Sequence, residues 1–469
     1  MIQKPVLLDD ARMIHSVSPA LDDGWNWRMH CDDNIKPHAN YYESTLSKWD
    51  MQPSLQRDVS CDVLVIGGGI LGCSTALHLA ENGVDVILVE KNHIGSSASG
   101  RNGGQLTPGL ARWDAQNMLE YFSHDVAGRL WKLTGQDSMD LIDSIIEKYN
   151  LETDRSHGHI TAAVHPGHLS ELIKSADARS YLGDNAVKVI GKHNIEDYIS
   201  STNYYGGAID SLGGQIHPLA LNRGLAYGIN INGGQIFERS EVTEIQDGGS
   251  EKIVIVNGMV VRVKKATVLA VHHRAPLFRS GILSTTMPFH SYIGVSTPMN
   301  VPVEKLIPSL MPVYDTRLQI DYYRAVRKNR ILFGGHGTGS SLAPDKVNRY
   351  LTSRFKKVFG VHQDIAFDYI WSGVSDITIN GATDCSRTEE SIPTYTVHGW
   401  NGHGVAQSVQ FGKTISDDIL NKNEDFKILS KIGHVAIPFG QCIAPVVIPA
   451  AKAVIKMKNV FTPGEMISF

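Results

Sequence analysis

Three glycines near position 70 have the spacing of a phosphate-binding turn. Gly67, Gly69 and Gly72 form a GxGxxG motif, and the apolar run 63–66 leads directly into it. The first glycine of such a motif permits a tight turn from strand to helix, the second lets the backbone approach a pyrophosphate, and the third lets the helix pack closely on the sheet. Because the N-terminal end of a helix attracts negative charge, this segment predicts a dinucleotide site.

A carboxylate follows at the distance that a dinucleotide site requires. The helix that begins after the motif is predicted to end at Gly83, and the segment 84–89 predicts a second strand that Glu90 closes, 18 residues after Gly72. An acid at this place accepts hydrogen bonds from ribose hydroxyl groups and repels a 2′-phosphate. The motif alone does not separate NAD from FAD, and an ordinary α/β crossover without a ligand is the alternative.

The segment after the second strand is small, polar and rich in glycine. Gly95 to Gln105 has the sequence GSSASGRNGGQ, in which small residues let backbone amides approach a bulky ligand. Arg101 could contact a phosphate or a substrate anion. Together with GGGILG and VEK, this segment resembles the FAD-dependent amine and amino-acid oxidoreductases of the D-amino acid oxidase superfamily, most closely the γ-glutamylputrescine oxidase branch. The resemblance runs from about Tyr41 to the C-terminus.

The resemblance implies an α/β (α+β) fold, in which a Rossmann-type FAD-binding domain is interleaved with an antiparallel-sheet substrate domain. The expected parts are an N-terminal extension (1–59), a discontinuous FAD-binding domain (60–115, 200–275 and 385–430), a substrate domain (116–199 and 276–384) and a C-terminal tail that packs on the FAD-binding domain (431–469).

A second glycine-bearing turn lies far along the chain. HGWNGHGV, from His398 to Val405, resembles the family's GxSGHGV and precedes a predicted helix over 406–420. Amides at the start of that helix can stabilise negative charge on a reduced flavin, which favours FAD. The resemblance also implies that the Val242 backbone recognises the adenine. The residues expected at FAD are Gly67, Gly69, Ile70, Leu71, Gly72, Glu90, Lys91, Ser97, Ser99, Arg101, Asn102, Gly103, Gly104, Gln105, Val242, Ala270, Gly402, His403, Gly404 and Val405.

Two segments depart from the family pattern. Val271-His272-His273 stands where the family has a small residue followed by glycine, and 378–385 lacks the family's Arg-x-Pro-x-x-Gly element. Cys385 is not where the covalently flavinylated oxidases place their cysteine, so the resemblance implies non-covalent FAD. The departures indicate a substrate other than the γ-glutamylated diamine of the nearest branch.

Three residues are candidates for catalysis. Tyr323 and Arg324 point to opposite faces of a regular strand, so at most one of them faces the flavin; Tyr323 is the candidate, with plain packing as the alternative. His336 lies among glycines and titrates near neutrality. His403 is expected to contact the flavin rather than to shuttle protons.

A pair of histidines raises the question of a metal. His157 and His159 share one face of a predicted strand. A metal site needs further ligands, none of which is close in sequence, and a flavin needs no metal. We therefore predict no metal.

Charge, cysteine content and apolar segments indicate which classes of protein this chain does not belong to. The 469 residues carry a formal charge of −4 and contain no basic run, which argues against a nucleic-acid partner. Five scattered cysteines without CxxC spacing indicate reduced thiols. The sequence has no apolar segment of signal-peptide or membrane-spanning length, so we expect a cytoplasmic enzyme. The oligomeric state is open, with a homo-oligomer among the alternatives.

The N-terminal extension contains Trp25, Trp27, Tyr41, Tyr42 and Trp49. A segment this rich in aromatic residues is predicted to pack on the body of the protein. The role of residues 1–40 cannot be inferred from their sequence.

The chemistry implied by the resemblance is oxidation of a C–N bond of a small amine or amino acid to an imine. Oxygen or another acceptor then reoxidises the FAD. The alternatives are an accessory or non-catalytic flavoprotein that acts with a partner protein, and a flavin-dependent hydroxylase.

Overall fold

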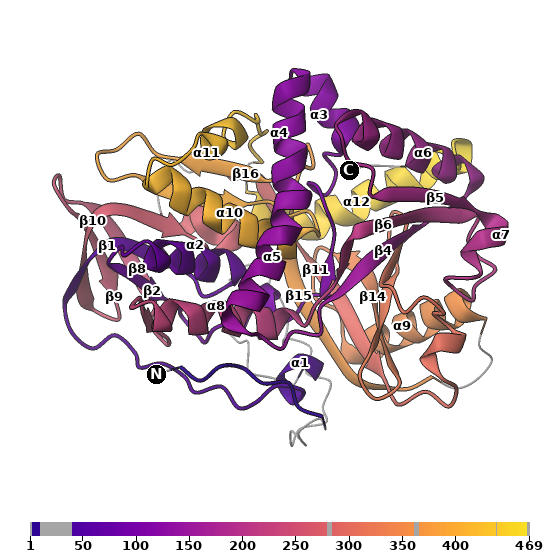
Figure 1. Cartoon of the computed structure of the whole chain (residues 1–469), viewed down its shortest axis with the longest axis horizontal. Coiled ribbons are helices and arrows are strands. Elements are labelled where there is room, and N and C mark those ends of the chain that lie inside the picture. The colour runs from indigo at the N-terminus through magenta and orange to yellow at the C-terminus, as the bar shows by residue number, and fades with distance from the viewer. Residues whose placement is uncertain (1, 10–39, 279–283, 361–364, 438, 467–469) are drawn as a thin grey trace.

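The computed structural model describes residues 2–9, 40–278, 284–360, 365–437 and 439–466. Trp25 and Trp27, for which packing is predicted, lie outside these residues. The strands gather into two sheets, which lie on opposite sides of helix α5 (Gln136–Tyr149) in the view of Figure 1.

Eight strands of the described chain form the first sheet, and its central strands are parallel. β1 pairs with β2 on one side and with β10 on the other, so the apolar run 63–66 is buried. An unbroken apolar run is what a strand covered on both faces requires. In sheet order the strands are β16 (Asp384–Arg387), β17 (Thr394–His398), β10 (Met259–Leu269), β1 (Val59–Ile66), β2 (Val86–Val89) and β7 (Gln235–Phe237), with β9 (Lys252–Val256) paired to β10 and β8 (Val242–Asp247) paired to β9.

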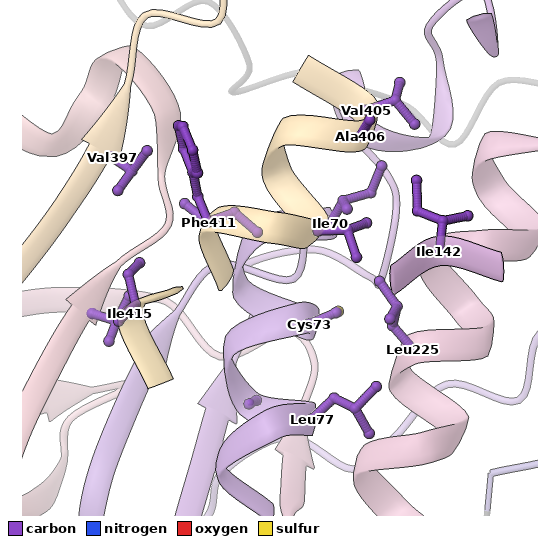
Figure 2. Packing of buried hydrophobic residues seen from close by; sticks show 14 of the residues in the cluster. Ile70, Cys73, Leu77, Ile142, Leu225, Val397, Val405, Ala406, Phe411 and Ile415 are labelled. Carbon is purple, nitrogen blue, oxygen red and sulfur yellow. The ribbon is translucent and has the colours of Figure 1, made fainter. Parts of the chain in front are cut away.

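Helix α2 (Ile70–Glu81) is the centre of a helical layer beside this sheet. It contacts α8 (Pro218–Ile231) and α10 (Gly404–Ile419), and both α8 and α10 contact α5. Figure 2 shows apolar side chains of α2 packed among those of these helices. Ser74 Oγ donates to the carbonyl of Val409 at 2.6 Å, which joins α2 to α10 directly. The start of α2 is therefore held against the start of α10.

Nine strands of the described chain form the second sheet, which is mostly antiparallel. The exception is the parallel pairing of β12 with β4. In sheet order the strands are β15 (Phe367–Thr378), β11 (Thr286–Ser296), β14 (Arg330–Thr338), β13 (Tyr322–Val326), β12 (Val313–Asp315), β4 (Ser156–Ala162), β6 (Gly206–Gln215) and β3 (Gln105–Leu106), with β5 (Val187–Gly191) paired to β6.

Helix α9 (Pro344–Phe359) contacts β11, β14 and β15 of the second sheet. Phe355 and Phe359 of this helix belong to an apolar cluster with Tyr323 and Phe333. Helix α12 (Gly440–Phe461) lies along β11 and β14. The remaining α-helices of the described chain are α1 (Tyr41–Ser44), α3 (Ala115–Tyr121), α4 (His124–Thr134), α6 (Pro166–Tyr181), α7 (Lys192–Ile195) and α11 (Asp425–Leu429).

The predicted fold class is confirmed, and the local elements agree with their patterns. The first β–α–β unit is β1, α2 and β2. Asn257 and Gly258 form the two-residue hairpin turn between β9 and β10, and both have the positive φ (50° and 82°) that a turn of this kind requires. Trp49 donates to the Glu238 carboxylate at 2.9 Å, and Tyr41 and Tyr42 are buried, so this part of the extension packs as predicted.

The sheets divide the chain differently from the expected domain boundaries. β6 belongs to the second sheet, although 200–275 is expected with the cofactor. Helices α4 and α5 contact α10, although 116–199 is expected with the substrate domain, and α12 contacts the second sheet rather than the first. The sequence patterns of these segments specify their type but not which sheet they join.

Candidate functional site

A cleft lies where β1, β2 and β10 end. Its walls combine residues from both glycine-bearing turns, because Gly67, Gly68 and Gly69 line it together with Trp400. Its further lining residues are Ile66, Leu71, Val89, Glu90, Lys91, Asn92, Ser96, Ser97, Ala98, Ser99, Ser240, Glu241, Val242, Ala270, Val271, His272, His273, Arg274, Phe278, Val374, Val397 and Ser408.

The first turn can be made only by glycines. Gly67 has φ of 112°, and a Cβ there would overlap the carbonyl of Ala270. A Cβ on Gly72 would overlap the carbonyl oxygen of Gly67. These close approaches let β1 pass into α2 within three residues, so that the start of the helix points into the cleft.

Glu90 fixes the loop above that turn. One carboxylate oxygen accepts from the amide of Gly68 (2.7 Å) and the other accepts from the amide of Asn92 (2.8 Å). Burial raises the pKa of Glu90, and the two amides oppose that rise. Lys91 pairs with Glu241 at 2.9 Å, which closes the same end of the cleft.

The segment 95–105 spans the distance between the cleft and the second sheet. Ser99 Oγ accepts from the amide of Ile70 at 2.9 Å and so caps α2. Arg101 is buried and its Nε donates to the carbonyl of Ser372 at 2.9 Å, while Trp371 Nε1 donates to the carbonyl of Arg101 at 2.8 Å. Gln105 donates to the carbonyl of Val313 at 2.9 Å. The end of this segment therefore holds β15 and β12 in place.

The second turn is fastened to β15 by one carboxylate. Asp376 is buried, and its oxygens accept from the amides of Gly399 (2.8 Å) and Trp400 (2.9 Å). His272 Nε2 lies 3.1 Å from the same carboxylate. Burial alone raises the pKa of Asp376, but His272, His398 and the amide of Gly399 outweigh it and hold the pKa below its ordinary value. Asp376 is thus ionised and organises the turn that precedes α10.

Part of the predicted cofactor set lines the cleft: Gly67, Gly69, Leu71, Glu90, Lys91, Ser97, Ser99, Val242 and Ala270. The rest lies beside it in the turns, in α2 and α10, and against the second sheet: Ile70, Gly72, Arg101, Asn102, Gly103, Gly104, Gln105, Gly402, His403, Gly404 and Val405. Trp400, His272 and Asp376 were not predicted. Trp400 lies inside the HGWNGHGV turn, whereas Asp376 has no local signal because its partners are distant in sequence.

Tyr323 lies away from the cleft. It is buried in the cluster under α9, its hydroxyl donates to that of Tyr204 (3.1 Å), and its ring stacks on Phe333. Its neighbour Tyr322 lies on the other face of β13, against Gly103 and Ser291. The alternation along the strand is as expected, but the tyrosine selected for catalysis is the one that packs, because α9 covers its face.

His336 also does not line the cleft. It has φ of 61° and stacks on Tyr350 with ring centroids 4.0 Å apart. Burial, with a smaller contribution from Lys452, lowers its pKa to about 4, so it is neutral at pH 7. His403 precedes α10, and its ring centroid is 6.1 Å from that of Tyr314 on β12.

Within the described ranges, no three His, Cys, Asp or Glu side chains are grouped as metal ligands. None of the helices in the same ranges combines the length and hydropathy that a membrane crossing needs.

Known proteins are similar to this chain in sequence and in fold. The sequence profile described as DAO, FAD dependent oxidoreductase, matches residues 62–417. Gamma-glutamylputrescine oxidoreductase of Escherichia coli (strain K12) is 29% identical over 406 residues, covering 86% of this chain and 94% of the relative. Probable oxidoreductase OrdL of Haemophilus influenzae is 31% identical over 412 residues, covering 87% and 94%.

Solved structures of other oxidoreductases are similar to this chain in fold. Glycine oxidase from Geobacillus kaustophilus superposes with a TM-score of 0.65 at 19% identity, covering 81% of this chain and 98% of that structure. L-proline dehydrogenase from P. horikoshii has the same TM-score at 18% identity, with 78% and 94% covered. Because the profile match spans most of the chain, from β1 to α10, this protein belongs to the DAO family of FAD-dependent oxidoreductases.

Proposed function

We propose that this protein oxidises a C–N bond of a small amine or amino acid to an imine, with oxygen or another acceptor reoxidising the cofactor. The substrate loses two electrons and two protons as C–N becomes C=N, and water then hydrolyses the imine. FAD supplies the two-electron acceptor when bound. The observation that carries the proposal is the single cleft lined by both the 67–69 turn and Trp400.

The cleft suits FAD in its shape and in its donors. A Cβ on Gly69 would lie 2.8 Å from Ser99 Oγ, so only glycine leaves the helix start open to a pyrophosphate. Glu90 places a carboxylate near that turn, where a ribose would bind. At the other end, Trp400 and Val374 provide apolar surface for a flat ring system.

We propose that FAD is held without a covalent bond. The described cysteines Cys61, Cys73 and Cys385 are buried and none lines the cleft, while Cys442 is exposed on α12. Burial raises the pKa of the Cys385 thiol well above its ordinary value, which disfavours the reactive thiolate.

The test is a spectroscopic assay of the purified protein. We expect the visible absorption of oxidised flavin, complete release of that flavin into the supernatant on acid precipitation, and loss of the visible band when a panel of amines and amino acids is added without oxygen. Peroxide formation on readmitting oxygen separates an oxidase from a dehydrogenase. A colourless protein that cannot be reconstituted with FAD would overturn the proposal, as would a flavin that no member of the panel reduces.

A further inference from the structure

The last helix of the described chain, α12, has two faces with different surroundings. One face packs on the second sheet: α12 contacts β11 and β14, and Ala444, Ile448 and Ile455 are buried. Lys452, which is half-buried, donates from Nζ to the carbonyl of Gly337 on β14. In Figure 1 the helix (yellow) lies on the same side of α5 as the second sheet. The helix is therefore fixed to the body of the protein, and its other face points away from the sheet.

The face that points away is apolar. We call it the outer face of α12; it consists of Val446, Val454, Met457, Val460 and Phe461, each of which is 62–83% exposed. Successive residues of a helix are about 100° apart around its axis, so these five side chains project from the side opposite the buried face. Four of the five lie after Pro449, the last proline of the helix.

Exposed apolar side chains are concentrated in this part of the chain. Eighteen large apolar side chains are exposed in the described ranges, and eight of them lie between residues 435 and 466. Five of the eight form the outer face of α12, and the others are Val435, Phe439 and Met466. Single exposed apolar side chains need no explanation, but a group of them on one element marks an interaction surface. The outer face of α12 is such a group.

The charges beside the outer face have one sign. Residues 440–461 include no Asp or Glu, and their exposed cations are Lys456 and Lys458. These two lysines lie on opposite flanks of the outer face, since about 200° separates them around the helix axis. Glu465 pairs with Lys458 at 3.0 Å, but both side chains are more than half exposed, so this pair is weak. The surface thus has an apolar centre and two cationic borders.

This combination suits an anionic bilayer better than a second copy of the chain. Lysines at the borders of an apolar face reach phosphate groups while the apolar side chains enter the acyl boundary. A two-fold contact between copies joins the same patch of both, and it would bring cations towards cations. Helix α12 follows the segment 62–417 that the family profile matches, so membership of the family does not by itself explain this surface.

We propose that the outer face of α12 binds the surface of a bilayer that contains anionic phospholipid. Its apolar side chains enter the boundary between headgroups and acyl chains, and Lys456 and Lys458 contact the headgroup phosphates. The helix lies in the plane of the membrane and does not cross it, because no helix in the described ranges has the length and hydropathy for a crossing. None of the outer-face residues lines the cleft, so this binding requires no particular reaction there.

The first experiment measures sedimentation of the FAD-loaded wild-type protein with two kinds of vesicle. One kind is phosphatidylcholine alone, and the other is an equal mixture of phosphatidylcholine and phosphatidylglycerol. We expect at least about fivefold tighter binding to the mixture, because exposed lysines are attracted to an anionic surface. That binding should weaken as the salt concentration is raised. Binding to neither kind of vesicle, or equal binding to both, would overturn the proposal.

The second experiment assigns the binding to α12. Met457→Glu and Phe461→Glu each place a carboxylate on the outer face, and each should weaken binding to the anionic vesicles about tenfold or more. Lys456→Gln should weaken it about two- to fivefold. Ile231→Glu is the matched control, because Ile231 ends α8 and is 50% exposed, so this variant makes the same change of charge on a different helix. Equal losses in Phe461→Glu and Ile231→Glu would overturn the assignment.

A second copy of the chain is the competing occupant, and light scattering of the wild-type protein and of Phe461→Glu tests it. A wild-type dimer that Phe461→Glu dissociates, without vesicle binding, would assign the outer face to a second copy and overturn the proposal. The wild-type vesicle comparison needs no variant, so a variant that fails to fold leaves the proposal falsifiable. A protein that binds vesicles but whose flavin no amine reduces overturns only the proposed function.

Discussion

His272 Nε2 lies 3.1 Å from Oδ1 of Asp376, and this contact joins the loop after β10 to the turn before α10. The same carboxylate accepts from the amides of Gly399 and Trp400. His272 has φ of 60°, a conformation that glycine adopts without strain. His272 thus lies in the segment where the family has a small residue followed by glycine. Its imidazole contacts the buried carboxylate of Asp376, which organises one wall of the cleft.

Replacing His272 should separate the contribution of its contact with Asp376 from the cost of its backbone strain. His272→Ala and His272→Gly both leave Asp376 buried without its imidazole, so each should lower the free energy of unfolding by about 1–3 kcal/mol. The glycine variant should be the more stable of the two by about 1 kcal/mol, because it relaxes the left-handed backbone. Urea unfolding measures both, and wild-type midpoints for the pair would contradict the role assigned to this contact.

Glu90 should be required for cofactor retention. Glu90→Gln keeps the shape but leaves one acceptor oxygen for the two amides of Gly68 and Asn92, and it removes the charge. We expect FAD affinity to fall about tenfold or more, as for the loss of one hydrogen bond to a charged group.

Glu241→Gln is the control for that experiment. Glu241 lines the same cleft, but its side chain is 52% exposed and pairs with Lys91 near the surface. Such pairs contribute little, so FAD affinity should stay within about twofold of the wild type. Fluorescence titration of the apoprotein with FAD gives both values, and equal losses in the two variants would contradict the role of Glu90.

Gly72 should tolerate no side chain. In Gly72→Ala the new Cβ would overlap the carbonyl oxygen of Gly67, which is backbone and cannot rotate away. We expect a loss of about 1–3 kcal/mol in the free energy of unfolding, together with weaker FAD retention. Gly128→Ala is the control: Gly128 lies in α4 with open space around its Cβ position, so this variant should gain up to about 1 kcal/mol. Denaturation midpoints check both signs.

His217 should make stability depend on pH. Its Nδ1 accepts from the amide of Ala220 at 3.1 Å, and burial lowers its pKa to about 3. The unfolded chain binds this proton near pH 6.5, so stability falls as the pH drops below that value. Between about pH 7 and pH 5 the loss from this residue is roughly 2 kcal/mol.

His217→Asn keeps a side-chain acceptor at the start of α8 but removes the titration. The fall in stability between the two pH values should therefore be smaller in this variant than in the wild type. Urea unfolding at both pH values measures the difference. Identical falls would show that His217 does not titrate as its burial requires.

The elements that can be predicted from the sequence are those set by contacts between near neighbours in the chain. The first β–α–β unit follows from an apolar run, three glycines and an acid within about one supersecondary unit, and the 257–258 turn follows from Asn-Gly. Helix α10, which starts at Gly404, follows from the glycine-bearing turn that precedes it. These patterns act through backbone sterics and hydrogen bonds between near neighbours, so they are decided before the rest of the chain folds.

The chain by itself determined the class of the fold, the residues of the first turn and the resemblance to FAD-dependent oxidoreductases. Tertiary structure alone decided that Tyr322 rather than Tyr323 faces the 95–105 segment, that β6 joins the second sheet, and that His272 meets Asp376. The physical reason is that these outcomes depend on which face a distant helix or strand covers. A strand's alternation fixes two faces, but only the packing of α9 on one of them decides which face is core.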